Sequence, residues 1–224
     1  RKKSDNSVIE IVPFRIGFRR EEFLNVKVND KIEALVLFFN GKPIKYKGVN
    51  IHEHNEVTGH YVTDEIRLKD IELLKRHNFN ALRFSHYPQC RRFYEMCDEF
   101  GFYVYSECNI ESHGMGFNSK NTLANKPIWF DAHMDRTKNM YERTKNHACV
   151  TFFSLGNEAG NGENFYKTYE YLKQNELNAQ NRPVNYEGAW CAENTDMFVP
   201  MYLTAQDLES LIGFNAYKGI LPCE

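Results

Sequence analysis

From about residue 45 onward, short apolar segments alternate with segments of helical periodicity, and this alternation constrains the fold more than any other feature of the chain. The segments expected as strands are 45–50, 81–85, 103–107, 150–155, 184–187, 197–202 and 220–224. The segments expected as helices are 64–77, 89–100, 129–147 and 163–175. Thr63 stands where an N-cap is expected, with Asp64 and Glu65 in the first turn. Repeated strand and helix segments are typical of an α/β fold with a parallel sheet.

The number and spacing of these units favour one architecture. Seven expected strands within about 180 residues suit a (β/α)₈ TIM barrel that is apparently truncated near strand 7, because a complete barrel takes roughly 250 residues. A doubly wound open sheet is the alternative. No GxGxxG motif follows the first strand, so the most useful sign of a doubly wound nucleotide-binding fold is missing.

Residues 1–44 have a different pattern, with the alternation of short β segments. Segments 8–12, 23–28 and 34–39 are expected strands, and Asn40-Gly41 is a strong hairpin signal. We interpret residues 1–44 as the tail of an immunoglobulin-like β-sandwich domain with a linking hairpin, and residues 45–224 as the barrel domain. Because the sequence starts at Arg1 without a methionine, we expect it to be part of a longer protein.

Charge, hydropathy and cysteine content exclude several classes of partner. The chain has 28 basic and 30 acidic residues and no basic block interleaved with aromatic residues, so nucleic acid is a poor candidate for a partner. No apolar run reaches the roughly 18 to 20 residues of a membrane span, and residues 1–11 lack the apolar core of a signal peptide, so we expect no membrane contact and leave the compartment open. The six cysteines form no CxxC pair, and we expect buried free thiols.

Polar side chains collect where the expected barrel strands end. They are Asn50, His52, His54, Ser85, His86, Tyr87, Glu107, Glu111, His113, Asn157, Glu158, Glu187, Tyr202 and Glu224. Each alone has a mundane explanation as a solvated loop residue, but a barrel brings the strand ends to one mouth, where barrel enzymes carry out their chemistry. Carboxylates for acid/base work, amides and imidazoles for hydroxyl groups, and aromatic rings for apolar sugar faces suit glycoside hydrolysis.

Several strings in these positions carry a specific resemblance. They are Asn40-Gly41-Lys42-Pro43-Ile44, Gly48-Val49-Asn50-Ile51-His52-Glu53-His54, Asn80-Ala81-Leu82-Arg83-Phe84-Ser85-His86-Tyr87-Pro88, Asn109-Ile110-Glu111-Ser112-His113-Gly114, Ser154-Leu155-Gly156-Asn157-Glu158-Ala159-Gly160-Asn161-Gly162, Tyr186-Glu187-Gly188 and Pro200-Met201-Tyr202. From about residue 8 to the end, the chain resembles family 2 glycoside hydrolases, and in particular the bacterial β-galactosidases of the lactose-operon type.

This resemblance implies a retaining β-galactosidase and a role for each matching residue. Glu158 corresponds to the acid/base, and Glu224, in Leu221-Pro222-Cys223-Glu224, to the nucleophile. Asn157 matches the residue that binds the sugar hydroxyl next to the anomeric carbon. His52 and His86 match histidines that touch the galactosyl group, and Tyr202 matches a tyrosine that contacts the nucleophile.

The resemblance also implies a metal and an assembly. Glu111, His113 and Glu158 match the ligands of a magnesium site, and because imidazole is an unusual ligand for a hard cation, Mn²⁺ should be tolerated as well. A homo-oligomer is expected of the full-length protein. With strand eight missing, residues 1–224 alone are expected to form an incomplete barrel without activity.

Three alternatives stay open. A family 2 β-glucuronidase or β-mannosidase would share the barrel and both glutamates. A non-catalytic carbohydrate-binding fragment would keep the fold but is expected to have lost catalytic positions, whereas both glutamates are present. A metal-dependent hydrolase using His52, His54, Glu111 and His113 would lack the HExxH motif or any other compact ligand motif.

Overall fold

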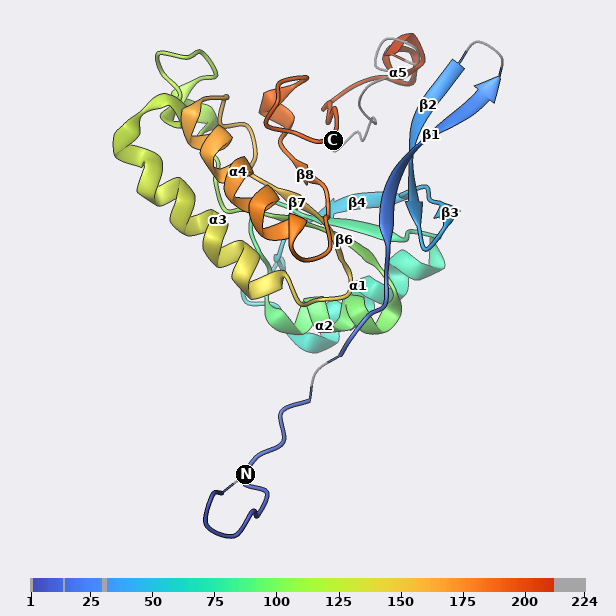
Figure 1. Ribbon diagram of the computed structural model, residues 1–224, viewed down its shortest axis with the longest axis vertical. Coiled ribbons are helices and arrows are strands. Elements are labelled where there is room, and N and C mark those ends of the chain that lie inside the picture. Colours follow the sequence, from blue (N-terminus) through green and yellow to red (C-terminus); the bar gives the residue numbers. More distant parts are fainter. Residues whose placement is uncertain (1, 14, 30–31, 212–224) are drawn as a thin grey trace.

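The computed structural model describes residues 2–13, 15–29 and 32–211, and its centre is a five-stranded parallel sheet (Figure 1). The strands are β4 (Gly48–Ile51), β5 (Ala81–Phe84), β6 (Tyr103–Glu107), β7 (Val150–Ser154) and β8 (Val184–Asn185). They pair in the order of the sequence, each parallel to the next. The first five expected barrel strands are therefore confirmed to within a few residues, whereas the expected strand 220–224, with Glu224, lies outside the described residues.

One helix connects each strand to the next. The connections are α1 (Asp64–Arg76), α2 (Arg91–Phe100), α3 (Phe130–Thr144) and α4 (Glu163–Leu177). Helix α1 begins as predicted, because the Thr63 hydroxyl accepts a hydrogen bond from the backbone N–H of Ile66 at 3.5 Å. Strands that pair in strict sequence order argue against the doubly wound alternative, in which the strand order reverses at a switch point.

The two faces of the parallel sheet differ in character. One face carries Leu82, Phe84, Val104 and Phe153, which are almost completely buried in one cluster with side chains of the four helices. The opposite face carries Arg83 from β5, Glu107 from β6 and Ser154 from β7. This division is typical of a barrel, with helices outside and the side chains of the site inside.

Before the parallel sheet, the chain forms a three-stranded antiparallel sheet of β1 (Glu21–Asn29), β2 (Ile32–Phe39) and β3 (Lys42–Pro43). The predicted Asn40-Gly41 turn joins β2 to β3, with φ of 50° and 77°, the left-handed values that a type I′ hairpin turn requires. Leu37 of this sheet packs in one cluster with Tyr105 and Phe152 of the parallel sheet. The immunoglobulin-like domain stays a prediction.

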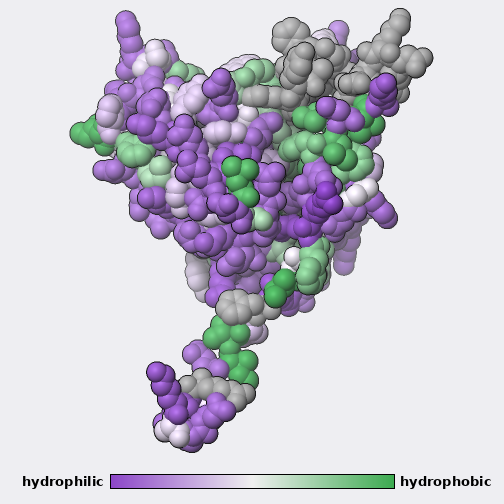
Figure 2. Space-filling model, in the orientation of Figure 1, coloured by the Kyte–Doolittle hydropathy of each residue, from purple (hydrophilic) through white to green (hydrophobic). Residues whose placement is uncertain are grey.

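Two expected strands are absent from the described part of the chain. Residues 8–12 lie in an extended arm with its apolar side chains exposed, and no described strand pairs with it (Figures 1 and 2). Residues 197–202 form no named strand either, although Met197, Phe198 and Val199 are buried. Met197 and Val199 pack with Leu37 in the cluster described above, and Phe198 between them takes part in an isolated β-bridge, so the apolar pattern reflects burial with a single bridge in place of a full strand.

The cysteines agree with the sequence interpretation in part. Cys97, Cys108 and Cys149 are buried free thiols, and Cys90 is half-buried. Cys191 is exposed, against expectation, because the loop after β8 places it at the surface, and Cys223 lies outside the described residues. Among the described helices, none is both long and apolar enough to cross a membrane.

Candidate active site

A buried ion pair organises the inner face of the parallel sheet. Arg83 donates through Nε to Glu107 Oε2 at 2.8 Å, and the side chains of the two residues are 5% and 0% exposed. The same oxygen accepts a hydrogen bond from the Ser154 hydroxyl at 2.7 Å, while Arg83 also donates to Asn157 Oδ1 at 2.8 Å. The arginine therefore joins three consecutive strands and fixes the Asn157 amide through Oδ1, so that Nδ2 is the end that can donate to another group.

The two histidines assigned to the sugar lie together at the ends of β4 and β5. His86 Nδ1 is 2.7 Å from Glu107 Oε1, and a carboxylate at this distance holds the proton on Nδ1 and places Nε2 on the far side of the ring. The His52 and His86 rings are 5.2 Å apart. Burial, followed by the neighbouring His86, lowers the pKa of His52, so the neutral imidazole is favoured near neutral pH.

The predicted acid/base sits on a tight loop directly after β7. A side chain at Gly156 would come within 2.6 Å of the Ile110 carbonyl oxygen, so only glycine lets the two loops approach this closely. That carbonyl accepts the N–H of Asn157 at 2.9 Å, and Glu111 forms a parallel bridge with Asn157. Glu158 follows in the left-handed region with φ of 39°, an uncommon conformation for a residue other than glycine and one that tends to occur at functional sites.

Glu158 has two close partners. Its Oε2 atom is 3.0 Å from His113 Nδ1, and its backbone N–H donates to Glu187 Oε1 at 2.6 Å. Burial raises the pKa of Glu187 to about 7, and the nearby charge of Glu158 adds to this, against the opposing hydrogen bond from the Glu158 amide and the attraction of Arg83. Two carboxyl groups thus lie near one another beside the loop, and that of Glu187 is partly protonated near neutral pH.

A cavity of about 520 Å³ opens beside these carboxyl groups. Glu158 and Glu187 line it together with Tyr202, which is exposed and lies among the residues that follow the buried 197–199 segment. Phe117 and Trp190 add two more exposed aromatic side chains. The volume and the mixture of carboxylates with aromatic rings suit a sugar ring.

The predicted metal ligands are brought together only in part. His113 and Glu158 are in contact, and Glu111 belongs to the neighbouring loop, which is bridged to the Glu158 loop at Asn157. Among the described residues, no three His, Cys, Asp or Glu side chains are arranged to share an ion. Two carboxylates and one imidazole still form a donor set that fits a divalent cation, and the exposed Glu111 and His113 side chains can rotate toward Glu158.

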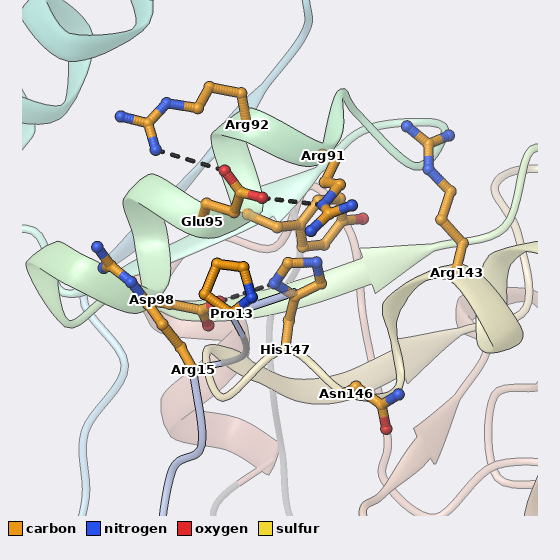
Figure 3. A pocket seen from close by; sticks show the side chains of 10 residues that line it. Pro13, Arg15, Arg91, Arg92, Glu95, Asp98, Arg143, Asn146 and His147 are labelled. Carbon is orange, nitrogen blue, oxygen red and sulfur yellow. Dashed lines mark hydrogen bonds and ion pairs between the residues drawn. The ribbon is translucent and has the colours of Figure 1, made fainter. Parts of the chain in front are cut away.

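A second cavity, of about 540 Å³, lies away from this site, between the N-terminal arm, α2 and the segment before β7 (Figure 3). Its charged residues are largely paired. Arg91 and Arg92 both reach Glu95, and His147 Nδ1 lies 2.7 Å from Asp98 (Figure 3). Arg15 of the arm pairs with Glu99 at 3.2 Å. Of these contacts, the exposed Arg15–Glu99 pair alone involves the arm, and none of the predicted site residues lines this cavity.

Arg83 and Trp190 were given no role in the sequence analysis, and Glu107 and Glu187 were named there only among the strand-end residues, without a role of their own. Glu107 and Glu187 stand at strand ends, so the signal that identified Glu158 was present for them as well. Arg83 lies inside an apolar strand and not at its end, so its position in the sequence gave no sign that it belongs to the site. Both histidines, Asn157 and Glu158 lie just after the carboxyl ends of β4, β5 and β7, whereas Tyr202 follows a segment that forms no named strand, and Glu224 lies outside the described residues.

Comparison with protein families gives a match over most of the chain. Residues 26–217 match the family described as glycosyl hydrolases family 2, TIM barrel domain. A β-galactosidase of Streptococcus thermophilus is 43% identical over 218 residues, which cover 93% of this chain and 20% of that protein. A β-galactosidase of Vibrio cholerae is 43% identical over 199 residues, 88% of this chain and 18% of that protein. The chain thus spans about a fifth of the length of these relatives.

Solved structures share the fold. A β-glucuronidase from Ruminococcus gnavus, in complex with C6-substituted uronic isofagomine, superposes with a TM-score of 0.66 at 26% identity, covering 84% of this chain and 32% of that chain. A β-glucuronidase from Bifidobacterium dentium, complexed with coumarin-3-O-glucuronide, superposes with a TM-score of 0.70 at 24% identity, covering 92% of this chain and 35% of that chain. At the latter identity the likeness shows the fold alone.

Proposed function

The chain belongs to family 2 of the glycosyl hydrolases, as part of the TIM barrel domain of that family, and we propose that the protein is a retaining β-galactosidase acting on terminal, non-reducing β-D-galactosides. The observation that carries this proposal is the position of Glu158. Its carboxyl group lies at the carboxyl end of β7, in contact with His113 and beside Glu187, on the wall of the cavity. Curated relatives at 43% identity are named β-galactosidases.

The proposed reaction has two steps, in which Glu158 acts first as acid and then as base. In the first step the carboxylate of Glu224 attacks the anomeric carbon while the glycosidic bond breaks, and Glu158 gives its proton to the departing oxygen. In the second step Glu158 takes a proton from water, which attacks the anomeric carbon and releases Glu224. This retaining mechanism requires the two carboxyl groups to lie about 5 to 5.5 Å apart.

The polar network around Arg83 would hold the sugar in this proposal. Asn157 would donate to the hydroxyl next to the anomeric carbon through the amide nitrogen that Arg83 leaves available. His86, held by Glu107, and the neighbouring His52 would contact the galactosyl group. Tyr202 would approach the nucleophile from the wall of the same cavity.

A β-glucuronidase is the second candidate, because solved structures with this fold carry that name. A glucuronide brings a carboxylate that needs a cation as a partner. Among the described residues lining the cavity, the only charged side chains are Glu158 and Glu187, both acidic. The nearby Arg83 is already committed to Glu107 and Asn157. A neutral sugar, held at Asn157 and the two histidines beside this cavity, therefore suits the site better than a uronic acid.

The test is a panel of 4-nitrophenyl β-glycosides assayed with the full-length protein. We expect the galactoside to be hydrolysed at least about 100-fold more efficiently than the glucuronide or the mannoside, because misplaced or unpaired polar groups on the wrong sugar cost several kcal/mol. Proton NMR of the first product formed should show the β-anomer, since two displacements retain the configuration. Faster turnover of the glucuronide, or an α-anomer as the first product, would contradict the proposal.

We also propose that Mg²⁺, with Mn²⁺ as a substitute, binds to Glu111, His113 and Glu158. The bound cation would supply positive charge next to the Glu158 carboxyl group and so stabilise its ionised form. His113→Ala in the full-length protein should weaken Mg²⁺ binding about 10- to 100-fold, and high Mg²⁺ should restore part of the lost activity. Calorimetry measures the binding, and an affinity unchanged in the variant would remove His113 from the ligand set.

A further inference from the structure

Trp190 is a large aromatic residue that is exposed to solvent on the wall of the cavity lined by Glu158 and Glu187. It follows the short helix η4 (Glu187–Ala189), and 67% of its surface is exposed. It lines the cavity together with Glu158 and Glu187. A tryptophan with a purely structural role is expected to bury most of its surface, so this exposure next to two carboxyl groups calls for a functional explanation.

The indole is supported on one side and open on the other. Phe198, which is 5% exposed, lies with its ring centre 6.0 Å from that of Trp190 at an interplanar angle of 35°. Trp190 also has φ of 52° and ψ of −108°, a positive-φ conformation that bulky residues rarely adopt. A buried ring therefore backs the indole while the chain turns it outward, which is the arrangement of a stacking platform.

The chemistry of the proposed reaction indicates which part of the substrate meets this platform. The proposed sugar contacts His52, His86 and Asn157 gather around Arg83 and Glu107, and none of the three lines the wall that contains Trp190. Glu158 links the sugar contacts to the wall that contains Trp190, because it follows Asn157 in the chain and itself lines the cavity. A general acid must lie within hydrogen-bond reach of the departing oxygen, so the space beyond it holds the leaving group.

We propose that Trp190 is a specificity-determining residue that stacks on the leaving group, and that the protein favours galactosides whose leaving group presents a flat apolar face, such as an aryl group or a second sugar ring. This inference rests on the proposed function only in that the protein hydrolyses a glycoside, and it does not depend on which sugar is transferred. The stack forms with the leaving group alone, so its contribution should vary with the leaving group and not with the sugar that is transferred.

The experiment compares Trp190→Ala with the wild type in the full-length protein on three galactosides: methyl, 4-nitrophenyl and a disaccharide. We expect kcat/KM to fall about three- to tenfold for the aryl and disaccharide substrates, the value of one aromatic stack, and to change less than about twofold for the methyl galactoside. Trp190→Phe should restore most of the loss. The matched control is Trp129→Ala, which removes the other tryptophan, 43% exposed on the separate helix η3 (Pro127–Trp129).

The outcomes separate this inference from the proposed function. An equal loss on all three substrates, or no loss on any, overturns the stacking role, while a loss confined to the aryl and disaccharide substrates supports it. If the wild type hydrolyses glucuronides and not galactosides, the proposed function fails, and the same comparison with methyl and aryl glucuronides still decides the role of Trp190. If the protein hydrolyses no β-glycoside, both proposals are wrong.

Discussion

At the scale of single residues, the pair of Arg83 and Glu107 is the most consequential feature of the molecule. Both side chains are buried, and Glu107 is hydrogen-bonded by Arg83, Ser154 and His86. Glu107→Gln should lower the free energy of unfolding by about 3–5 kcal/mol, because it leaves the guanidinium buried without a counter-ion. Urea denaturation measures the loss. The double variant Arg83→Met with Glu107→Gln should lose less than the sum of the single variants, and additive losses would mean that the two residues do not act as a pair.

The role of Glu158 can also be tested at this scale. Glu158→Gln in the full-length protein should lower kcat far more for a galactoside with a poor leaving group than for an activated aryl galactoside, because only the poor leaving group needs a proton. Added azide should restore part of the turnover, since it attacks the galactosyl-enzyme without a general base. Steady-state kinetics on both substrates measure the difference, and equal losses would speak against the assignment.

At the scale of elements, β1 carries a buried carboxyl group that no described residue hydrogen-bonds. The side chain of Glu21 is 2% exposed and lies 3.5 Å from Arg19 Nε, outside the range of a good hydrogen bond. Burial raises its pKa to about 8, and the attraction of Arg19 offsets this only in part. The folded state therefore binds a proton more tightly than the unfolded chain, so Glu21 contributes stability at low pH that is lost as the pH rises from about 4.5 to 8.

Glu21→Gln should remove this pH dependence. The free energy of unfolding of the variant, relative to that of the wild type, should increase by about 1–3 kcal/mol between pH 5 and pH 8. Denaturation curves across this range measure the change. The control is Glu22→Gln, the next residue of β1, whose carboxyl group pairs with Arg20 and is 29% exposed. The same trend in both variants would show that burial of Glu21 is not the cause.

At the scale of the whole molecule, stability should be distributed unevenly. Strands β6 and β7 are buried along nearly their whole length and have a paired strand on each side, whereas the described residues of the arm, 2–13 and 15–18, are exposed. In hydrogen exchange of this chain, backbone amides of β6 and β7 should exchange slowest, and those of residues 2–12 should exchange at nearly unprotected rates. Mass spectrometry of the exchanging chain measures this, and comparable protection of the arm would show that the arm packs against the body.

The sequence by itself determined the order of the five parallel strands and the four helices between them, and it indicated most residues of the candidate site. Hydrophobic periodicity and capping residues depend only on residues close together in the sequence. The helix that begins after Thr63 and the turn at Asn40-Gly41 could therefore be predicted directly from the residues. Strand-end polar residues and motif strings likewise indicated Glu158, His52, His86 and Asn157, because a parallel barrel brings successive strand ends to one mouth.

Only the tertiary structure decided which side chains act together. Arg83 and Asn157 are 74 positions apart, and Glu187 reaches the Glu158 amide across 29 positions. Such contacts depend on strand register and on which face each side chain occupies, and local patterns do not specify either. At 197–202 the apolar residues pack into a core with an isolated β-bridge at Phe198, and the sequence pattern of such a segment resembles that of a full strand. The exposure of Trp190 beside the Glu158 and Glu187 carboxyl groups became visible only once the chain was folded, because its position depends on where the loop after β8 runs.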